Sequence, residues 1–204
     1  MDILAYRTGV YGVLAELAKE PDASLVCQLP AMAEYLAEAF AALGYPPPDG
    51  GWQDWPRQAS SLEKLQAAYR RSFIYPPDSR VVPVESVYRQ WTFDPTAKLP
   101  FAREKGYLMS DAALHMQALY EGYGLTIPAT MKATPDHLCL ELEFACFLLE
   151  NETAERYATF LREHLDWLDE LCQEAARQET DRFYRQVLAA ISRFVGCERE
   201  RYGG

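Results

Sequence analysis

The sequence lacks the features of membrane-spanning, exported and nucleic-acid-binding proteins. Its apolar runs stay far below the roughly 20 residues that a helix needs to cross a bilayer. The first residues show no basic region followed by a hydrophobic core and a cleavage site, so we expect a cytoplasmic protein. The formal net charge of −10 is unsuited to nucleic acid, whose phosphates require a basic surface. We therefore predict no nucleic-acid partner and no direct insertion into a membrane.

Paired cysteines and catalytic signatures are also missing. The five cysteines are irregularly spaced, with no C-x-x-C pair, and we interpret them as free thiols that pack as small hydrophobic groups. No phosphate-binding loop, dinucleotide-binding turn, nucleophile elbow or H-E-x-x-H helix is present. Ala112, Thr134 and Leu161 stand three residues before the histidines, which excludes the Glu-x-x-His pair of di-iron bundles. We expect no enzymatic activity, no cofactor and no metal.

Two carboxylate–histidine pairs leave a metal or acid–base role open. Asp111 and His115 are four residues apart, as are His137 and Glu141. Either pair could be half of a metal site or an acid–base dyad. Such a pair on a helix is more often a structural hydrogen bond, and we favour that interpretation.

What the sequence does contain is helical patterning almost throughout. We predict an all-α fold, a single globular domain over residues 1–204 with about eight to ten helices. The Pro-rich region around residues 75–105 is longer than ordinary connections, and we expect a hinge there, which could divide the domain into two lobes. Gly44 should end a helix that Ser24 caps. From Arg199 onward we expect a polar, frayed tail.

Residues 134–149 carry the most informative pattern. Thr134 can cap a helix, Pro135 suits its first position, and Asp136 places a negative charge near the positive end of the helix dipole. The stretch that follows is almost wholly apolar, as in a helix buried nearly all round. We therefore predict a central, buried helix from Pro135 to about residue 150.

Polar groups on this predicted helix fall into two stripes. Asp136, Glu143 and Glu150 are spaced by seven and should face water. His137 and Glu141 lie about a third of a turn away. A protonated imidazole at a helix start opposes the dipole, so we expect His137 to have another partner, either Glu141 or a ligand. Asp136 and His137 thus either serve the helix start or form part of a binding site.

The same segment resembles a known family. The sequence PDHL at residues 135–138, followed by EL at 141–142, is similar to the signature of the TorD/DmsD/NarJ-type redox-enzyme maturation chaperones. Three further segments resemble that family in the expected order: PVESVY at 83–88, MQALY at 116–120 and FLREHLDW at 160–167. Glu85 departs from the pattern, because some relatives carry a small residue there.

The resemblance implies a cytoplasmic chaperone for a molybdopterin oxidoreductase. Such proteins bind the twin-arginine leader and the apo form of the catalytic subunit, assist cofactor insertion and proofread the enzyme before export. In that family the pair matching Asp136 and His137 is associated with leader binding. The resemblance leaves open whether the chain is a monomer or a homodimer.

The chemistry of such a leader determines which charged and apolar groups its binding site must contain. The leader is a cationic segment followed by a moderately apolar stretch of about 7–15 residues. An arginine fork can pair bidentately with Asp136 or Glu85, and we expect the apolar part to lie in a groove between the predicted helix and residues 83–91. The predicted peptide-binding residues are Pro83, Glu85, Ser86, Tyr88, Trp91, Tyr120, Pro135, Asp136, His137 and Glu141.

Two other classes of function stay open at this level. One is an assembly subunit that binds a folded partner through a flat helical face and has no preference for an isolated leader. The other is a helical metalloenzyme that uses His137, Glu141, Asp111 and His115.

Overall fold

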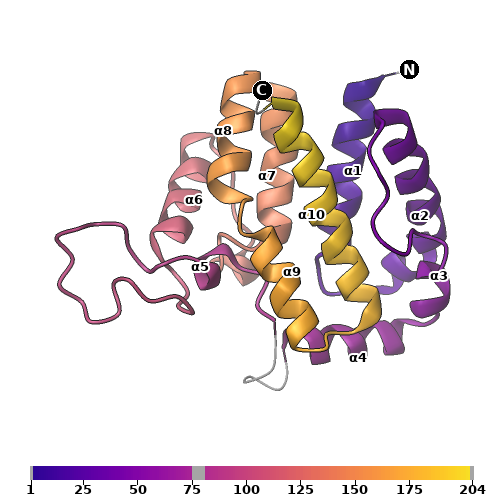
Figure 1. Ribbon diagram of the computed structural model, residues 1–204, viewed down its shortest axis with the longest axis horizontal. Coiled ribbons are helices and arrows are strands. Elements are labelled where there is room, and N and C mark those ends of the chain that lie inside the picture. The colour runs from indigo at the N-terminus through magenta and orange to yellow at the C-terminus, as the bar shows by residue number, and fades with distance from the viewer. Residues whose placement is uncertain (1, 75–80, 203–204) are drawn as a thin grey trace.

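The computed structural model describes residues 2–74 and 81–202, which are helical with no strand (Figure 1). The all-α prediction is confirmed. Residues 75–80 of the predicted hinge lie outside the described residues, and a division into two lobes stays a prediction. The elements are α1 (Ile3–Leu17), α2 (Ala23–Leu43), α3 (Trp55–Gln58), α4 (Leu62–Phe73), α5 (Glu85–Tyr88), α6 (Asp111–Gly122), the 3-10 turn η2 (Ala129–Met131), α7 (Leu138–Asn151), α8 (Ala154–His164), α9 (Leu168–Arg177) and α10 (Arg182–Tyr202).

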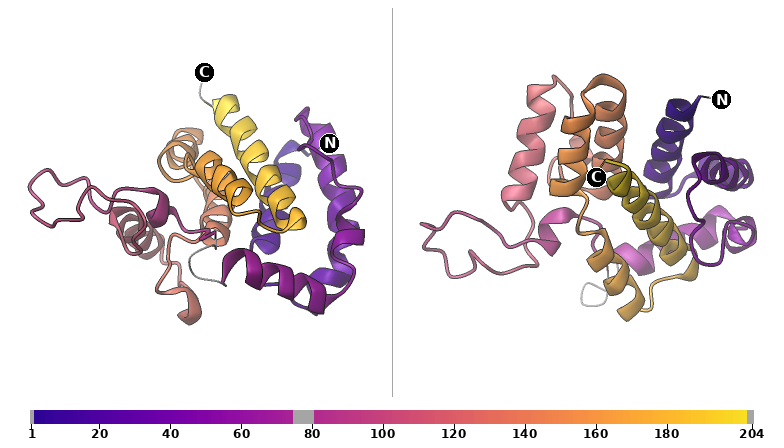
Figure 2. Two further views of the ribbon diagram at one scale, coloured as in Figure 1. Left: turned by 60° about the horizontal axis from the view of Figure 1, so that its bottom comes forward. Right: turned by 45° about the horizontal axis from the view of Figure 1, so that its top comes forward.

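Helix α7 lies at the centre of the fold, as its apolar sequence predicts. It packs against α1 on one side and α8 on the other, while α10 runs across α1, α8 and α9 (Figures 1 and 2). Leu142 and Ala145 are fully buried, whereas Glu143 and Glu150 are exposed as predicted. Within the described ranges, no helix combines the length and apolar character that crossing a membrane requires.

The ends of α2 show how local capping sets helix boundaries. Gly44 ends this helix in the left-handed conformation, with φ of 73°, as predicted. Asp22, not Ser24, caps its start, because the Asp22 carboxylate accepts a hydrogen bond from the backbone N–H of Leu25 at 2.8 Å. The sequence prediction of the cap was therefore wrong by two residues.

The predicted frayed tail beyond Arg199 is wrong, because α10 continues past this residue. Glu198 on its last turns is fully buried and anchors it to α1. The Glu198 carboxylate accepts hydrogen bonds from Arg7 Nε at 2.9 and 3.0 Å, from Tyr45 at 2.6 Å and from Tyr157 at 2.5 Å. The chain's last helix is thus fixed by a buried ion pair with its first.

The Pro-rich region after α5 forms a loop that projects from the helical body before α6 (Figure 1). The backbone N–H groups of Trp91 and Thr92 donate to the carbonyls of Glu104 and Ala102, each at 3.0 Å. These bonds close the base of the loop and fix the position of Trp91 next to α5.

Candidate functional site

The predicted start of the central helix is wrong by three residues. Helix α7 begins at Leu138, and His137 is its N-cap, with Nδ1 accepting from the backbone N–H of Cys139 at 3.3 Å. His137 also pairs with Val84 in an isolated antiparallel bridge. The bridge is closed by the bond from Leu138 N to Pro83 O at 2.9 Å. Bonding to a distant segment therefore replaces the helical turn that Pro135 would have started.

Asp136 is fully buried, so the prediction that it faces water is wrong. Its Oδ2 accepts hydrogen bonds from the backbone N–H of Ser86 at 2.7 Å and from the Ser86 hydroxyl. Burial raises the pKa of Asp136 above its ordinary value, although the bonds from Ser86 act in the opposite direction. Asp136 thus holds α5 against the start of α7.

His137 does not pair with the Glu141 side chain, one of the two partners proposed for it from the sequence. Its Nδ1 lies 3.2 Å from Cys139 Sγ and accepts the Cys139 N–H, whereas the Glu141 carboxylate accepts from Trp167. Burial lowers the pKa of His137 to about 4. A neutral imidazole can accept at a helix start without opposing the dipole, which explains how histidine serves as this cap.

The stability that neutral His137 contributes is expected to be lost in acid. Its pKa is about 4 in the folded chain against 6.5 ordinarily. Between these values His137 is protonated in the unfolded chain and neutral in the folded chain. Its contribution to the free energy of unfolding is therefore fully present above pH 6.5 and decreases as the pH drops toward 4. Asparagine also caps helices but does not titrate in this range. In His137→Asn, the free energy of unfolding lost between neutral pH and about pH 4 should therefore be smaller than in the wild type by on the order of 1–3 kcal/mol.

Urea unfolding of the wild type and of His137→Asn, from about pH 7.5 to about pH 4, measures this difference. Titrations common to both proteins cancel in the comparison. Two parallel pH profiles would show that His137 does not titrate as described.

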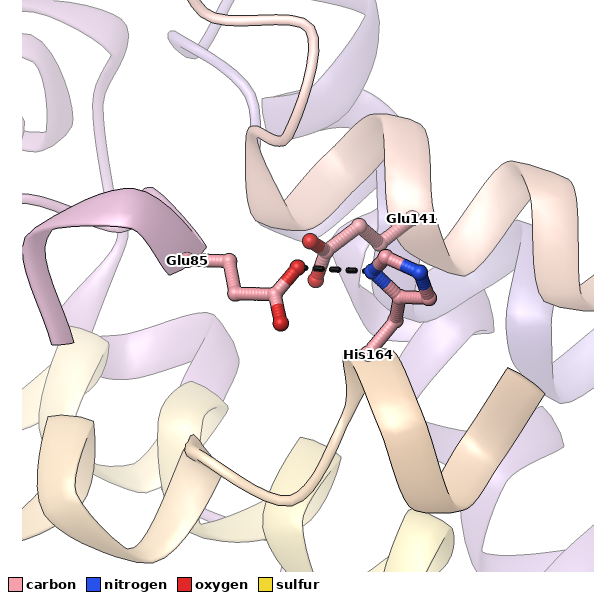
Figure 3. Close-up of side chains that lie close together, drawn as sticks. All are labelled: Glu85, Glu141 and His164. Atoms are coloured by element: carbon pink, nitrogen blue, oxygen red, sulfur yellow. Dashed lines mark hydrogen bonds and ion pairs between the residues drawn. The ribbon is translucent and has the colours of Figure 1, made fainter. Parts of the chain in front are cut away.

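A cluster of buried titratable groups lies next to this junction (Figure 3). Glu85 comes from α5, Glu141 from α7 and His164 from the end of α8, and their exposed fractions are 1%, 0% and 3%. His164 Nδ1 lies 2.8 Å from Glu85 Oε2, and its Nε2 lies 2.8 Å from Nδ1 of His115 on α6. His164 could not be linked to Glu85 from the sequence, because the two residues are 79 positions apart in the chain.

Each carboxylate of the cluster has one further polar contact. Arg89 Nε donates to Glu85 Oε1 at 3.0 Å, and the guanidinium also pairs with Asp166. Trp167 Nε1 donates to Glu141 Oε2 at 3.2 Å. Burial raises the pKa of Glu141 well above its ordinary value, and the charge of Glu85 adds to this shift. The cluster therefore favours a bound proton or cation.

The structure brings the ten predicted peptide-binding residues together around α5 and the start of α7. Tyr88 stacks on Trp167 with ring centroids 5.1 Å apart, and the Tyr120 hydroxyl donates to the carbonyl of Pro135 at 3.1 Å. Among the ten, only His137 and Trp91 are partly exposed. The other eight are buried, and their role in peptide binding stays a prediction.

The groove predicted between the central helix and residues 83–91 is wrong, because the bridge of Val84 to His137 joins these segments directly. The side chains of the two pairs spaced by four residues bond other partners, since Glu141 accepts from Trp167 and His115 pairs with His164. Asp111 instead accepts from the Thr92 hydroxyl at 2.8 Å and from the Phe93 N–H at 2.9 Å.

An open pocket lies instead between α6, α7 and α8. Its volume is about 660 Å³, within the range of small-ligand sites. Charged side chains at its edge include Arg156 and Glu163. Its apolar lining consists of Leu119, Tyr123, Phe144, Leu148 and Phe160.

A second pocket of about 410 Å³ adjoins the first, since His115, Glu163 and His164 line both. Its lining is mostly charged: Glu85, Asp111, Glu163 and Asp166 contribute carboxylates, and Arg89 and Arg162 contribute guanidinium groups. The two pockets, hereafter the groove, are neighbours, one with an apolar lining and the other with a carboxylate-rich lining.

Comparisons with known proteins agree with the resemblance carried by residues 135–142. The family model described as nitrate reductase delta subunit matches residues 20–185. The fold is similar to the crystal structure of a proposed redox enzyme maturation protein from Archaeoglobus fulgidus, with a TM-score of 0.53. The two chains are 19% identical, and the match covers 98% of this chain and 94% of that chain. No curated protein sequence gives a significant match.

Proposed function

Because this chain belongs to the nitrate reductase delta subunit family of maturation chaperones, we propose that it binds a twin-arginine leader and the apo form of a molybdopterin oxidoreductase catalytic subunit. Binding would protect the leader while the cofactor is inserted and would delay export until insertion is complete. The observation that carries this proposal is the groove, in which an apolar pocket adjoins a carboxylate-rich one.

The apolar part of the groove suits the hydrophobic stretch of a leader. Leu119 on α6 and Tyr123 just after it are partly exposed within it, so a peptide can reach them without unfolding the chain. Phe144 and Phe160 form its buried base. Apolar side chains in such a groove are the usual anchors for an amphipathic or extended peptide.

The carboxylate-rich part suits the leader's arginines. Arg89 already shows that a guanidinium fits there, because it bonds both Glu85 and Asp166. Glu163 is exposed, and its carboxylate forms no salt bridge within residues 2–74 and 81–202. It is therefore available to pair with an incoming arginine through a bidentate contact.

The expected affinity is that of a reversible complex. Burying several Leu-sized side chains would contribute on the order of 8–12 kcal/mol before costs. Ordering a disordered leader offsets several kcal/mol of this, which leaves roughly −6 to −8 kcal/mol, or binding in the micromolar to tens-of-micromolar range. A chaperone that must release its client needs an affinity of this order.

Replacing groove residues is expected to weaken leader binding by about tenfold or more, or about 1.4 kcal/mol. Leu119→Lys places a charge in the apolar part, and Glu163→Lys places a repelling charge where the arginines would lie. Isothermal titration calorimetry with a synthetic twin-arginine leader measures the affinity of each variant.

Matched controls lie on α6 outside the groove. Leu114→Lys changes a leucine that is 52% exposed, and Glu121→Lys reverses an exposed charge. Both should bind the leader as the wild type does. If the groove variants and controls bind equally, the leader does not occupy the groove. If the wild type binds a scrambled peptide equally well, the chain has no preference for the leader, as expected of an assembly subunit that binds a folded partner.

A further inference from the structure

The buried cluster of Glu85, Glu141 and His164 has the spacing of a metal site. One ligand atom from each residue lies within 4.8 Å of the other two. The three side chains converge from α5, α7 and α8 on one small volume (Figure 3). Each is at most 3% exposed, so they are held in place by packing and not by chance contact on a surface. Together they offer two carboxylates and one imidazole.

In each of the three side chains, one polar atom bonds a residue outside the cluster. The second polar atom points toward the centre of the cluster. Arg89 bonds Glu85 Oε1, Trp167 bonds Glu141 Oε2, and His115 bonds His164 Nε2. Metal ligands in proteins are oriented in this way, with a partner on the atom that does not bind the metal.

Glu141 supplies a second, independent observation that points to a cation. Its side chain is 0% exposed, and its Oε1 has no hydrogen-bond partner in residues 2–74 and 81–202. A buried carboxylate oxygen without a partner costs free energy that a bound cation would offset. The neighbouring carboxylate of Glu85 increases this cost, because two buried negative charges repel each other.

We propose that Glu85, Glu141 and His164 bind one divalent transition-metal ion, and that Zn²⁺ fits this donor set. Two carboxylate oxygens and one imidazole nitrogen are ligands that Zn²⁺ takes at about 2.0–2.2 Å. Mg²⁺ and Ca²⁺ prefer all-oxygen sites with more ligands, so the imidazole disfavours them. This site departs from the expectation of no metal and from the two histidine pairs suggested by the sequence.

The geometry needs only a small adjustment to bind the ion. Ligand atoms on a tetrahedral Zn²⁺ stand about 3.3–3.5 Å apart. The contact of 2.8 Å between His164 Nδ1 and Glu85 Oε2 would open slightly, and the separations of up to 4.8 Å would close. Glu85 and His164 line the charged pocket, which gives the ion a path from solvent. A bound ion would tie α5, α7 and α8 together beneath the groove.

Titration of the EDTA-stripped full chain with ZnCl₂ tests the site. We expect wild-type protein to bind one equivalent and to gain thermal stability on binding. Glu141→Gln keeps the size of the side chain and an oxygen for Trp167 but loses the charged ligand, so it should bind at least tenfold more weakly. Glu143→Gln is the matched control, because Glu143 is exposed on the same helix two residues away.

A second variant tests the hydrogen bonds between the cluster and the residues around it. His115→Ala removes the contact to His164 Nε2 without removing a ligand and should weaken Zn²⁺ binding by about tenfold. Circular dichroism checks that each variant folds. If Glu141→Gln does not fold, His164→Gln is used in its place. The proposal is overturned if wild-type protein binds no stoichiometric Zn²⁺, or if Glu141→Gln and Glu143→Gln bind alike. No leader is present, so this result is independent of peptide binding.

Discussion

Glu198→Ala is expected to lower the free energy of unfolding by about 3–5 kcal/mol, the range typical of breaking a buried ion pair. Glu198 is fully buried, and Arg7 is only 5% exposed. Removing the carboxylate leaves the Arg7 guanidinium buried without its counter-charge. It also takes away the acceptor for the hydroxyl groups of Tyr45 and Tyr157. Urea denaturation followed by circular dichroism measures the change.

The control for this experiment lies two residues further along α10. Glu200 is exposed, and Glu200→Ala should change stability by no more than about 0.5 kcal/mol. The double variant Arg7→Ala/Glu198→Ala should lose less than the sum of the two single variants, because it leaves no unpaired charge. Equal losses for Glu198→Ala and Glu200→Ala would contradict the described pairing.

Asp136→Ala is expected to cost about 2–4 kcal/mol of stability, because it leaves two buried donors of Ser86 without an acceptor. Ser86 is fully buried, and both its N–H and its hydroxyl bond Asp136 Oδ2. Asp136→Asn retains an oxygen of similar position and should lose less. Thermal and urea unfolding measure both variants.

Glu150→Ala provides the comparison, since Glu150 is an exposed acid on α7. Its stability should stay within about 0.5 kcal/mol of wild type. If Asp136→Ala is as stable as Glu150→Ala, the bonds to Ser86 do not fix α5. This comparison also separates the two possible roles of Asp136, because weaker leader binding by a folded Asp136→Asn protein would indicate a contribution beyond stability.

Features with a local cause could be predicted from the sequence. The apolar run after residue 138 gave the buried central helix, since no other placement removes so many apolar side chains from water. Gly44 gave the end of α2, because glycine readily adopts the left-handed conformation. The family resemblance was likewise carried by short, contiguous segments and is confirmed by the match to residues 20–185.

The tertiary structure alone decided how distant segments meet. Helix α7 begins at Leu138 and not at the predicted Pro135, because residues 83–85 form backbone hydrogen bonds with the chain at this point. No local sequence pattern predicts that bridge. Glu85 and His164 are 79 residues apart, and Arg7 and Glu198 are 191 apart. Periodicity and capping depend on neighbours within a few turns, whereas the burial and pairing of these charges depend on which helices pack together. The sequence alone thus determined the helices and the family, and packing alone determined the cluster, the groove and the buried ion pair.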